Sequence, residues 1–345
     1  MMKKVAVIGH LDWAENHMIG AVVKARNILA QLEKQFGSNQ VGNVDIYMWR
    51  NRKKTVLKGI LYAFAHYRNI VLVCSDTSVA LMTMFKMLKK LFHNKILYCV
   101  VGGNMAELLE DNPKQVGTLS SIDCFFVETQ DCVEGMKKIG INNVQLCRNF
   151  KSITPVSEND LRLEETAPIR FCTFSRVVAE KGITDAINAI TEINTDVGDM
   201  KCTLDIYGSV EPEYKTEFEN LLKGNPYVAY KGVVDSEKSV HILKDYYCLL
   251  FPTKFQTEGI PGTIIDAYAA GIPVICSNWI RCSQIVTDGV NGIVYPFGDY
   301  NALVKAIKDS MNSPKMVSRL KRGCLESFEL YRAEKAIKPL LEELI

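Results

Sequence analysis

Short apolar runs rich in β-branched residues alternate with amphipathic segments along the whole chain. Runs of this length that are apolar on both faces are typical of parallel strands buried between helices. The alternation therefore predicts an α/β fold with helices on both faces of each sheet. The expected strands of the first half are Lys4–Ile8, Asp45–Met48, Ile70–Val73, Ile96–Val101, Cys124–Val127 and Val144–Leu146, with helices at about 20–36, 55–66, 77–92 and 130–139, and the pattern resumes from Ile169–Phe174 to Gly292–Val294.

The chain has 345 residues, which is too many for one compact core of ordinary size. We therefore expect two Rossmann-like, doubly wound domains facing a central cleft, because such sheets bind ligands beyond the carboxyl ends of their strands. A polar stretch containing Pro155 and Pro168 has no sustained periodicity and predicts a connector. The expected parts are an N-terminal domain over 1–150, a linker over 151–168, a C-terminal domain over 169–325 and a terminal helical segment over 326–345.

The composition is that of a globular protein, with 48% hydrophobic and 23% charged residues. The sequence contains no run of about 18 uncharged apolar residues, so it predicts no membrane-spanning helix. The apolar run near the N-terminus, from Val5 to Gly9, is too short for a signal peptide and predicts a buried strand instead. The eleven cysteines stand singly, with no C-x-x-C pair, which favours reduced, buried thiols over disulfides or a zinc site.

The net charge of +2 conceals an asymmetry between the halves. Residues 1–160 carry 20 Lys and Arg against 14 Asp and Glu, whereas the rest carries 21 against 25. A basic first half favours an anionic partner there, such as a membrane surface or a phosphate-bearing acceptor. A solvated surface with a chance imbalance explains the same counts.

Two carboxylates stand eight residues apart in E-G-I-P-G-T-I-I-D, from Glu258 to Asp266. Glu258 lies in a Gly/Pro loop, and the run after it is apolar and helix-like. The helix N-terminus presents unpaired N–H groups and a positive dipole, which suit a phosphorylated ligand. Carboxylates suit the hydroxyl groups of a sugar or ribose. The pattern predicts a nucleotide-sugar site.

Arg176 and Lys181 lie just beyond the expected strand Ile169–Phe174, and a helix follows them. Two cations at a strand-to-helix junction can neutralise a diphosphate, because Arg forks onto two oxygens and Lys acts as a point charge. A pair of solvated surface charges would give the same residues, with Glu180 as an available partner.

At this point the chain resembles the retaining glycosyltransferases of family 4, which have the GT-B fold. The resemblance is carried by F-S-R-V-V-A-E-K-G, I-Y-G-S-V, Y-K-G-V-V and F-P-T-K-F-Q-T-E-G-I-P-G-T-I-I-D-A-Y-A-A-G-I-P-V-I-C-S, in that order, followed by V-T-D-G-V-N-G-I-V-Y-P-F-G-D. It covers nearly all of residues 165–345 and is looser over 1–150. In GT-B proteins the last helix crosses back to the N-domain, which the resemblance implies for 326–345.

The resemblance implies catalytic roles for Arg176 and Lys181, which would hold the donor diphosphate, and for Glu258, which would contact the donor sugar. The second acid of the family's E-x7-E element is Asp266 here rather than Glu, and it would form hydrogen bonds with the ribose hydroxyls. The other donor-binding candidates that the resemblance implies are Gly20, Gly208, Gly259, Ile260, Pro261, Gly262 and Thr263.

In this family the N-terminal half supplies the acceptor side. Many members carry a histidine after the fourth strand, whereas V-V-G-G-N here places Gly102 at that point. His10, at the end of the first strand, is a site candidate, although a histidine at a strand end is often a loop residue. The acceptor-side candidates are His10, Gly102, Gly103 and Asn104.

A basic amphipathic helix is expected over 85–95, in F-K-M-L-K-K-L-F-H-N-K. With the cations near residue 53 it could rest on anionic lipid, so a peripheral location on the inner face of the plasma membrane is one expectation. A half-buried helix with a solvated basic face is the alternative.

The implied reaction moves a sugar from a nucleotide diphosphate donor, most commonly a UDP-sugar, to a glycan or polyprenyl-diphosphate-linked acceptor in the cytoplasm, with retention of configuration. Without a D-x-D element in a plausible metal position, no metal cofactor is expected. The alternatives are a nucleotide-sugar epimerase of GT-B fold and a non-catalytic subunit that binds a nucleotide sugar. A dinucleotide-dependent oxidoreductase is disfavoured because no G-x-G-x-x-G follows a strand.

Overall fold

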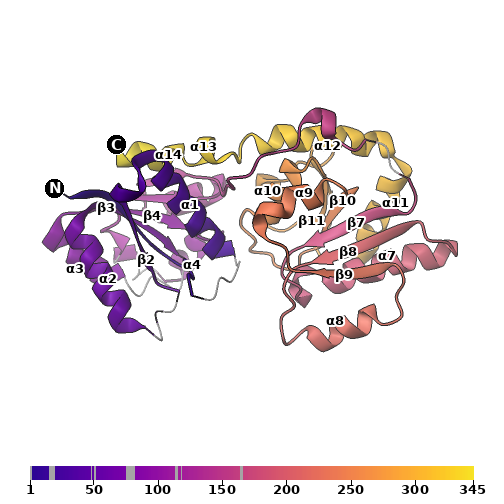
Figure 1. Ribbon diagram of the computed structural model, residues 1–345, viewed down its shortest axis with the longest axis horizontal. Coiled ribbons are helices and arrows are strands. Elements are labelled where there is room, and N and C mark those ends of the chain that lie inside the picture. The colour runs from indigo at the N-terminus through magenta and orange to yellow at the C-terminus, as the bar shows by residue number, and fades with distance from the viewer. Residues whose placement is uncertain are drawn as a thin grey trace. The chain divides into compact units, whose positions relative to one another are not determined.

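The computed structural model describes residues 2–14, 20–47, 49, 52–74, 82–112, 116–117, 119–163 and 166–345. The chain forms two compact units, shown in Figure 1. The first unit comprises Met1–Ser152 and Tyr331–Ile345, and the second unit comprises Ile153–Leu330. Each unit is built on its own sheet of six strands.

The strands are β1 (Lys3–Gly9), β2 (Val41–Asp45), β3 (Tyr67–Cys74), β4 (Lys95–Val100), β5 (Cys124–Val127), β6 (Val144–Leu146), β7 (Ile169–Phe174), β8 (Cys202–Tyr207), β9 (Val228–Gly232), β10 (Cys248–Phe251), β11 (Val274–Ser277) and β12 (Gly292–Tyr295). The helices are α1 (Gly20–Phe36), α2 (Lys53–His66), α3 (Met82–Phe92), α4 (Met105–Asp111), α6 (Gln130–Lys138), α7 (Ile183–Val197), α8 (Lys215–Leu222), α9 (Ser239–Leu243), α10 (Gly262–Ala269), α11 (Tyr300–Asn312), α12 (Pro314–Phe328), α13 (Ala333–Ala336) and α14 (Lys338–Leu344).

The first sheet has the order β2-β1-β3-β4-β5-β6, and all of its neighbouring strands are parallel. Successive residues of a strand point to opposite faces, and β1 shows the consequence. Val5 and Val7 pack with α1, α13 and α14, whereas Ala6 and Ile8 pack with α2, α3, α4 and α6. Both faces of the sheet are therefore covered, as the continuous apolar runs predict.

The second sheet has the order β12-β11-β10-β7-β8-β9 and is parallel throughout. Counted within the unit, this is the strand order of the classic dinucleotide-binding fold. Helices α7, α8, α11 and α12 contribute to the core on one face. The Rossmann-like two-domain fold expected from the sequence is confirmed.

The expected linker over 151–168 does not behave as one segment. Residues 153–163 and 166–168 pack on the second unit, where the N–H of Val156 donates to the carbonyl of Ala269 at 2.8 Å and Lys321 Nζ donates to the carbonyl of Arg162 at 2.5 Å. Side chains of the segment pack there as well, since a Cβ at Gly271 would lie 2.2 Å from Leu161 and 3.5 Å from Val156. Isolated apolar residues in a polar stretch give no periodic signal that would predict this docking.

The end of the chain is part of the first unit, from Tyr331 onwards. Helices α13 and α14 are drawn in yellow in Figure 1, and their apolar side chains share a core with those of α1. The division falls at 330/331 rather than at 325/326, because α12 continues to Phe328 in the second unit.

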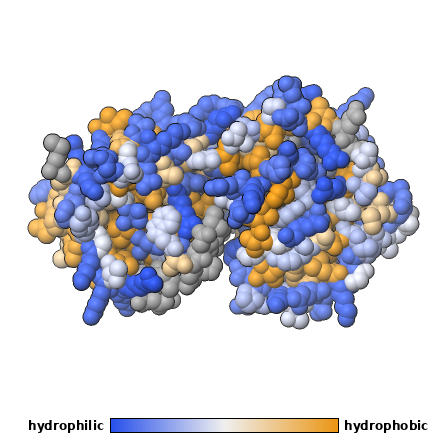
Figure 2. Space-filling view, viewed as in Figure 1, coloured by the Kyte–Doolittle hydropathy of each residue, from blue (hydrophilic) through white to orange (hydrophobic). Residues whose placement is uncertain are grey.

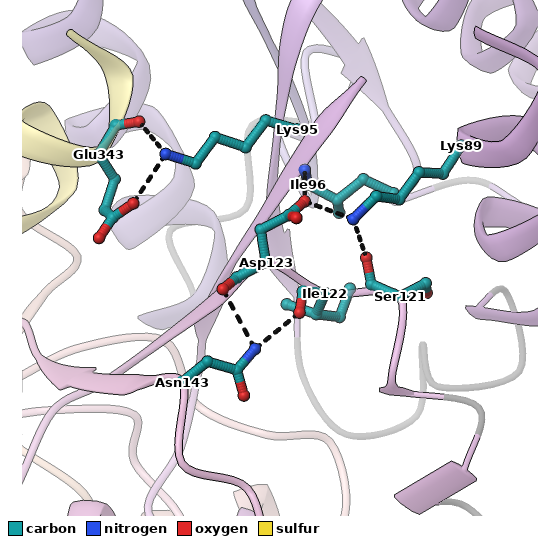
Figure 3. Close-up of polar contacts among 8 residues, drawn as sticks. All are labelled: Lys89, Lys95, Ile96, Ser121, Ile122, Asp123, Asn143 and Glu343. Carbon is teal, nitrogen blue, oxygen red and sulfur yellow. Dashed lines mark hydrogen bonds and ion pairs between the residues drawn. The ribbon is translucent and has the colours of Figure 1, made fainter. Parts of the chain in front are cut away.

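Polar contacts join the carboxyl end of α14 to β4 and connect the amino ends of β4, β5 and β6 (Figure 3). Lys95 Nζ donates to the backbone carbonyl of Glu343 at 2.6 Å and pairs with its carboxylate at 2.7 Å. Asp123 accepts from the backbone N–H of Ile96 at 2.7 Å and from Lys89 Nζ at 2.6 Å. The amide of Asn143 donates to the carbonyl of Asp123 at 3.1 Å. The terminal helix is thus held by charge as well as by apolar packing.

The strand expected over Asp45–Met48 is wrong. The observed strand β2 spans Val41–Asp45 and ends where the expected strand begins. The Asp45 carboxylate accepts from the backbone N–H groups of Leu11 at 3.1 Å, Trp13 at 3.0 Å and Tyr47 at 2.9 Å. A side chain that satisfies turn N–H groups in this way ends a strand. Met48 lies outside the described residues.

One ion pair lies inside the first unit. Lys24 on α1 reaches the Glu128 carboxylate at 2.5 Å and the carbonyl of Val100 at 2.7 Å, and both charged side chains are almost fully buried. Burying two charges costs desolvation energy that their attraction and hydrogen bonds must offset. Removing either charged side chain would therefore leave the other buried without its opposite charge.

All eleven cysteines are buried, and none of them forms a disulfide bond. Within the described ranges, none of the helices combines the length and apolar character needed to cross a membrane.

We expect Lys24→Met to lower the free energy of unfolding by about 3–5 kcal/mol, because it leaves the Glu128 carboxylate buried without its cation. The double variant Lys24→Met/Glu128→Leu should recover much of this loss. Lys34→Met is the matched control. Lys34 lies on α1, as Lys24 does, but its pair with Glu334 is exposed, so this substitution should cost under about 1 kcal/mol. Urea denaturation followed by circular dichroism measures all three, and equal losses for Lys24 and Lys34 would contradict the argument.

Candidate active site

Three of the predicted charged residues of the second unit lie at the point where its strand order reverses. Strands β7 and β10 are neighbours in the sheet, and the loop after each leads to a different side of it. Arg176 and Lys181 follow β7, and Glu258 follows β10. Open α/β sheets bind ligands at this topological switch point. The strand order, rather than the sequence spacing, brings these side chains to one edge.

Lys181 and Glu258 form a direct ion pair between these two loops. Their side chains are 13% and 14% exposed, and Thr253 Oγ1 donates to the same Glu258 oxygen at 3.1 Å. The Lys181 ammonium lies 5.2 Å from the ring centroids of both Phe251 and Phe255. Cation–π contacts of this kind strengthen as water is excluded. The pair is a fixed, partly dry positive and negative centre.

A glycine permits the close approach of these two loops. Gly182 has a φ of +70°, and a Cβ at this position would lie 1.9 Å from the carbonyl oxygen of Pro252. Any side chain would push the β7 loop away from the β10 loop, and Lys181 is the adjacent residue. The contact between Lys181 and Glu258 therefore depends on a glycine that forms no part of it.

Arg176 takes a different partner. Its guanidinium lies 3.3 Å from the Glu211 carboxylate in a half-exposed ion pair. Exposed pairs contribute at most about 1 kcal/mol, so Arg176 can exchange this carboxylate for a phosphate at little cost. Gly208, with a φ of +135°, packs against the same loop, and a Cβ there would lie 1.8 Å from the Ser175 carbonyl oxygen. The geometry gives Gly208 a packing role.

The helix α10 begins at Gly262, directly after Gly259, Ile260 and Pro261. Thr263 stands in its first turn, and in the described part of the chain its buried Oγ1 has no hydrogen-bond partner. The N–H groups of a helix start and an unused hydroxyl can donate hydrogen bonds to phosphate oxygens. Asp266, expected to bond ribose hydroxyls, is only 1% exposed. The helix buries almost every residue from Ile264 onwards, so Asp266 faces protein rather than solvent here.

The remaining predicted residues belong to the first unit. Gly20 begins α1, and a Cβ there would meet no described atom within 4 Å. Gly102 has a φ of +103° in the loop after β4, and the carbonyl of Gly103 accepts from the Cys132 thiol at 2.8 Å. Asn104 lies just before α4. These three loop residues lie at the carboxyl edge of the first sheet, beyond β4.

His10 follows β1 at the same edge, and its N–H donates to the carbonyl of Val73 on β3 at 3.4 Å. Burial lowers the pKa of His10, against a smaller opposing effect of the Asp45 carboxylate. The imidazole is therefore neutral near pH 7 and can accept as well as donate a hydrogen bond. Its ring lies edge-on to Tyr47, with centroids 6.1 Å apart.

Sequence reasoning missed Thr253, Phe251 and Phe255, which surround the Lys181 and Glu258 pair, and Asp45, which shapes the His10 loop. The signal for the first three was their position at and after the end of β10. For Asp45 the signal was an acid at a strand end, which is typical of turn capping. Among the described residues, no cluster of three or more His, Cys, Asp or Glu side chains is arranged to hold a metal ion.

Residues 168–313 match the family model described as glycosyl transferases group 1. The chain is 28% identical to an uncharacterised protein of the cps region of Klebsiella pneumoniae, over 47% of this chain and 41% of that protein. It is 22% identical to an uncharacterised glycosyltransferase of Methanocaldococcus jannaschii, over 87% and 76%. It is 28% identical to AmsK, an amylovoran biosynthesis glycosyltransferase of Erwinia amylovora, over 39% and 34%. The chain thus spans less than half the length of two of these three relatives.

Solved structures agree in fold. HepE of Anabaena, in complex with UDP and glucose, superimposes with a TM-score of 0.74 over 99% of both chains at 12% identity. A sucrose-phosphate synthase of Thermosynechococcus elongatus gives 0.76 over 99% of both chains at 17% identity. The class of enzyme that the family match and the relatives support is the glycosyltransferases.

We expect His10 to titrate below about 6.5, because burial disfavours its charged form. The unfolded chain would then bind a proton where the folded chain does not, so stability should fall as the pH drops below about 6.5. Histidine resonances followed by NMR against pH test this. A pKa for His10 at or above the ordinary histidine value of about 6.5 would contradict the prediction.

Proposed function

We propose that the protein is a retaining glycosyltransferase that moves a sugar from a UDP-sugar to an acceptor hydroxyl. The observation that carries this proposal is the Lys181 and Glu258 pair at the switch point of the second sheet. A cation and an acid held together there fit the two ends of one ligand, the diphosphate and the sugar. UDP and UDP-glucose are the ligands named for HepE, which supports uridine as the donor base.

In the proposed reaction, negative charge develops on the departing diphosphate. Arg176, Lys181 and the first turn of α10 would stabilise that charge as it forms. Glu258 would accept hydrogen bonds from the hydroxyls of the donor sugar. Asp266 would accept hydrogen bonds from the ribose hydroxyls after a local rearrangement that exposes it. On the front face, a leaving phosphate oxygen takes the proton of the acceptor hydroxyl while the new glycosidic bond forms. Side-chain cations thus replace a metal ion in this scheme.

The proposed acceptor is a glycan, or a lipid-linked oligosaccharide of a bacterial envelope. AmsK is named for amylovoran biosynthesis, and CapM of Staphylococcus aureus for capsular polysaccharide biosynthesis. We place the reaction in the cytoplasm, where buried thiols stay reduced and nucleotide sugars are made.

Removing either cation should reduce turnover. We expect Arg176→Ala and Lys181→Met each to lower kcat by about 10²–10³, the usual effect of deleting one group that stabilises transition-state charge. The measurement is UDP release from a panel of UDP-sugars with an acceptor, alongside thermal melting of each variant. Lys215→Ala is the matched control, because Lys215 is an exposed lysine on α8 paired with Glu219. Near-wild-type rates in a folded Lys181 variant would remove its assigned role.

Two alternatives predict different products. A nucleotide-sugar epimerase would convert labelled donor into an epimer without an acceptor. A non-catalytic subunit would bind UDP-sugar, which raises the melting temperature, yet release no UDP. The contact between Lys181 and Glu258 favours catalysis, because it fixes a cation where negative charge would develop on the departing diphosphate.

A second proposal concerns the surface of α2 and α3. Met87 and Leu91 are 69% and 68% exposed and lie four residues apart on one face of α3. Leu61 and Tyr62 are exposed on the neighbouring α2. Figure 2 shows hydrophobic surface at the left edge, where Figure 1 places α3. We propose that this α2–α3 face contacts an anionic membrane surface.

The cations of this face divide into two groups. Lys89 pairs with Asp123, and Lys86 Nζ lies 3.3 Å from the carbonyl of Gly117, so neither belongs to a freely solvated basic face. Lys54, Lys58 and Lys90 are exposed on the same two helices. Exposed apolar side chains flanked by lysines are the composition of an interfacial helix.

We expect Met87→Ser/Leu91→Ser to lose most of its binding to vesicles of phosphatidylglycerol and phosphatidylcholine, because it removes the inserted apolar area. Val290→Ser/Leu330→Ser is the control, since it removes exposed apolar residues of the second unit. Vesicle co-sedimentation at low and high salt gives the measurement. Equal binding by both double variants, or binding to pure phosphatidylcholine alone, would contradict the proposal.

A further inference from the structure

The loop after β1 presents a large aromatic side chain to solvent. Trp13 is 54% exposed, whereas Trp279 is buried and Trp49 packs against the core of the first unit. Single exposed apolar residues are common and need no explanation by themselves. Trp13 differs because the protein fixes its ring from several directions.

One face of the indole is stacked on a cation. The Arg26 guanidinium lies 4.7 Å from the ring centroid of Trp13. The same guanidinium donates to the carbonyls of Leu11 and Asp12, each at 2.7 Å. The indole N–H donates to Asn43 Oδ1 at 3.2 Å. With one face and one edge occupied, the exposed area of the ring belongs to the opposite face and its rim.

The backbone of the loop is fixed as well. The N–H groups of Leu11 and Trp13 both donate to the Asp45 carboxylate. Asp12 between them is fully buried and adopts a φ of +48°, a left-handed conformation that a non-glycine residue rarely takes. Such a conformation persists only where its surroundings impose it, and these positions cluster at ligand sites.

The loop lies where a ligand of the first sheet would bind. It follows β1, whose neighbours are β2 and β3, and the strand order reverses between β1 and β3. His10, three residues before Trp13, is anchored to β3 and neutral near pH 7. Neutral polar groups, the imidazole of His10 and the amide of Asn43, therefore stand in the same loop cluster as the indole.

We propose that Trp13 is a stacking platform for a pyranose ring of the acceptor glycan. This inference rests on the proposed glycosyltransferase activity and names the chemistry of its acceptor. The apolar C–H face of a sugar matches an exposed indole face. Because the indole is already held in place, binding costs little conformational entropy. The Arg26 guanidinium lies over the opposite face of the ring and donates to backbone carbonyls, so the exposed face favours a neutral sugar over a phosphate.

Two variants separate stacking from folding. Trp13→Ala removes the platform, and Trp13→Phe keeps an aromatic face without the indole N–H. Because the ring is exposed, both should melt near the wild-type temperature. Wild type and variants are tested for binding to an array of immobilised bacterial oligosaccharides in the presence of UDP. Hydrolysis of a UDP-sugar panel without acceptor is measured in parallel.

We expect the wild type to bind a subset of glycans, Trp13→Ala to bind them about tenfold more weakly, equivalent to about 1.4 kcal/mol, and Trp13→Phe to recover most of the affinity. Donor hydrolysis should stay unchanged in both variants. Unaltered glycan binding by Trp13→Ala, no glycan bound by the wild type, or weakened donor use in Trp13→Ala would each overturn the platform. Wild type that neither binds nor hydrolyses any UDP-sugar would instead overturn the proposed function.

Discussion

The second unit depends on one contact between two loops that are far apart in the sequence. Lys181 and Glu258 are separated by 77 residues and meet because β7 and β10 are adjacent at the reversal of strand order. Gly182 makes the approach possible by leaving room for the Pro252 carbonyl. Electrostatics then holds the pair, and the phenylalanine rings keep water from much of the ammonium. Positive charge, acid and helix N-terminus consequently share one edge of the sheet.

The first unit uses the same architecture for a different kind of surface. Its buried charged pair, Lys24 with Glu128, lies inside the unit. What it offers at the loop after β1 is an aromatic face, a neutral imidazole and an amide. Under the proposed function, the charged edge of the second sheet would suit a diphosphate, and the aromatic face of Trp13 would suit a sugar.

Much of the fold could be predicted because burial on both faces leaves a continuous apolar signal. Strand β5 (Cys124–Val127) has the predicted bounds, as does β7 (Ile169–Phe174). The prediction failed at β2, where V-G-N-V-D contains glycine and asparagine and reads as a turn. The edge position of β2 explains this, since an edge strand needs less apolar surface than a central one. The docking of residues 153–163 was not visible in the sequence, because a few scattered contacts leave no hydropathy pattern.

The amino-acid sequence by itself determined the α/β class, the division into two domains and the residue types needed to bind a nucleotide sugar, because these depend on local periodicity and side-chain chemistry. Tertiary structure alone decided which of those residues touch. It paired Lys181 with Glu258, gave Arg176 an exposed partner in Glu211 and buried Asp266. It also stacked Trp13 on Arg26. Strand order and the close approach of loops set these contacts, and neither is written in the spacing of residues along the chain.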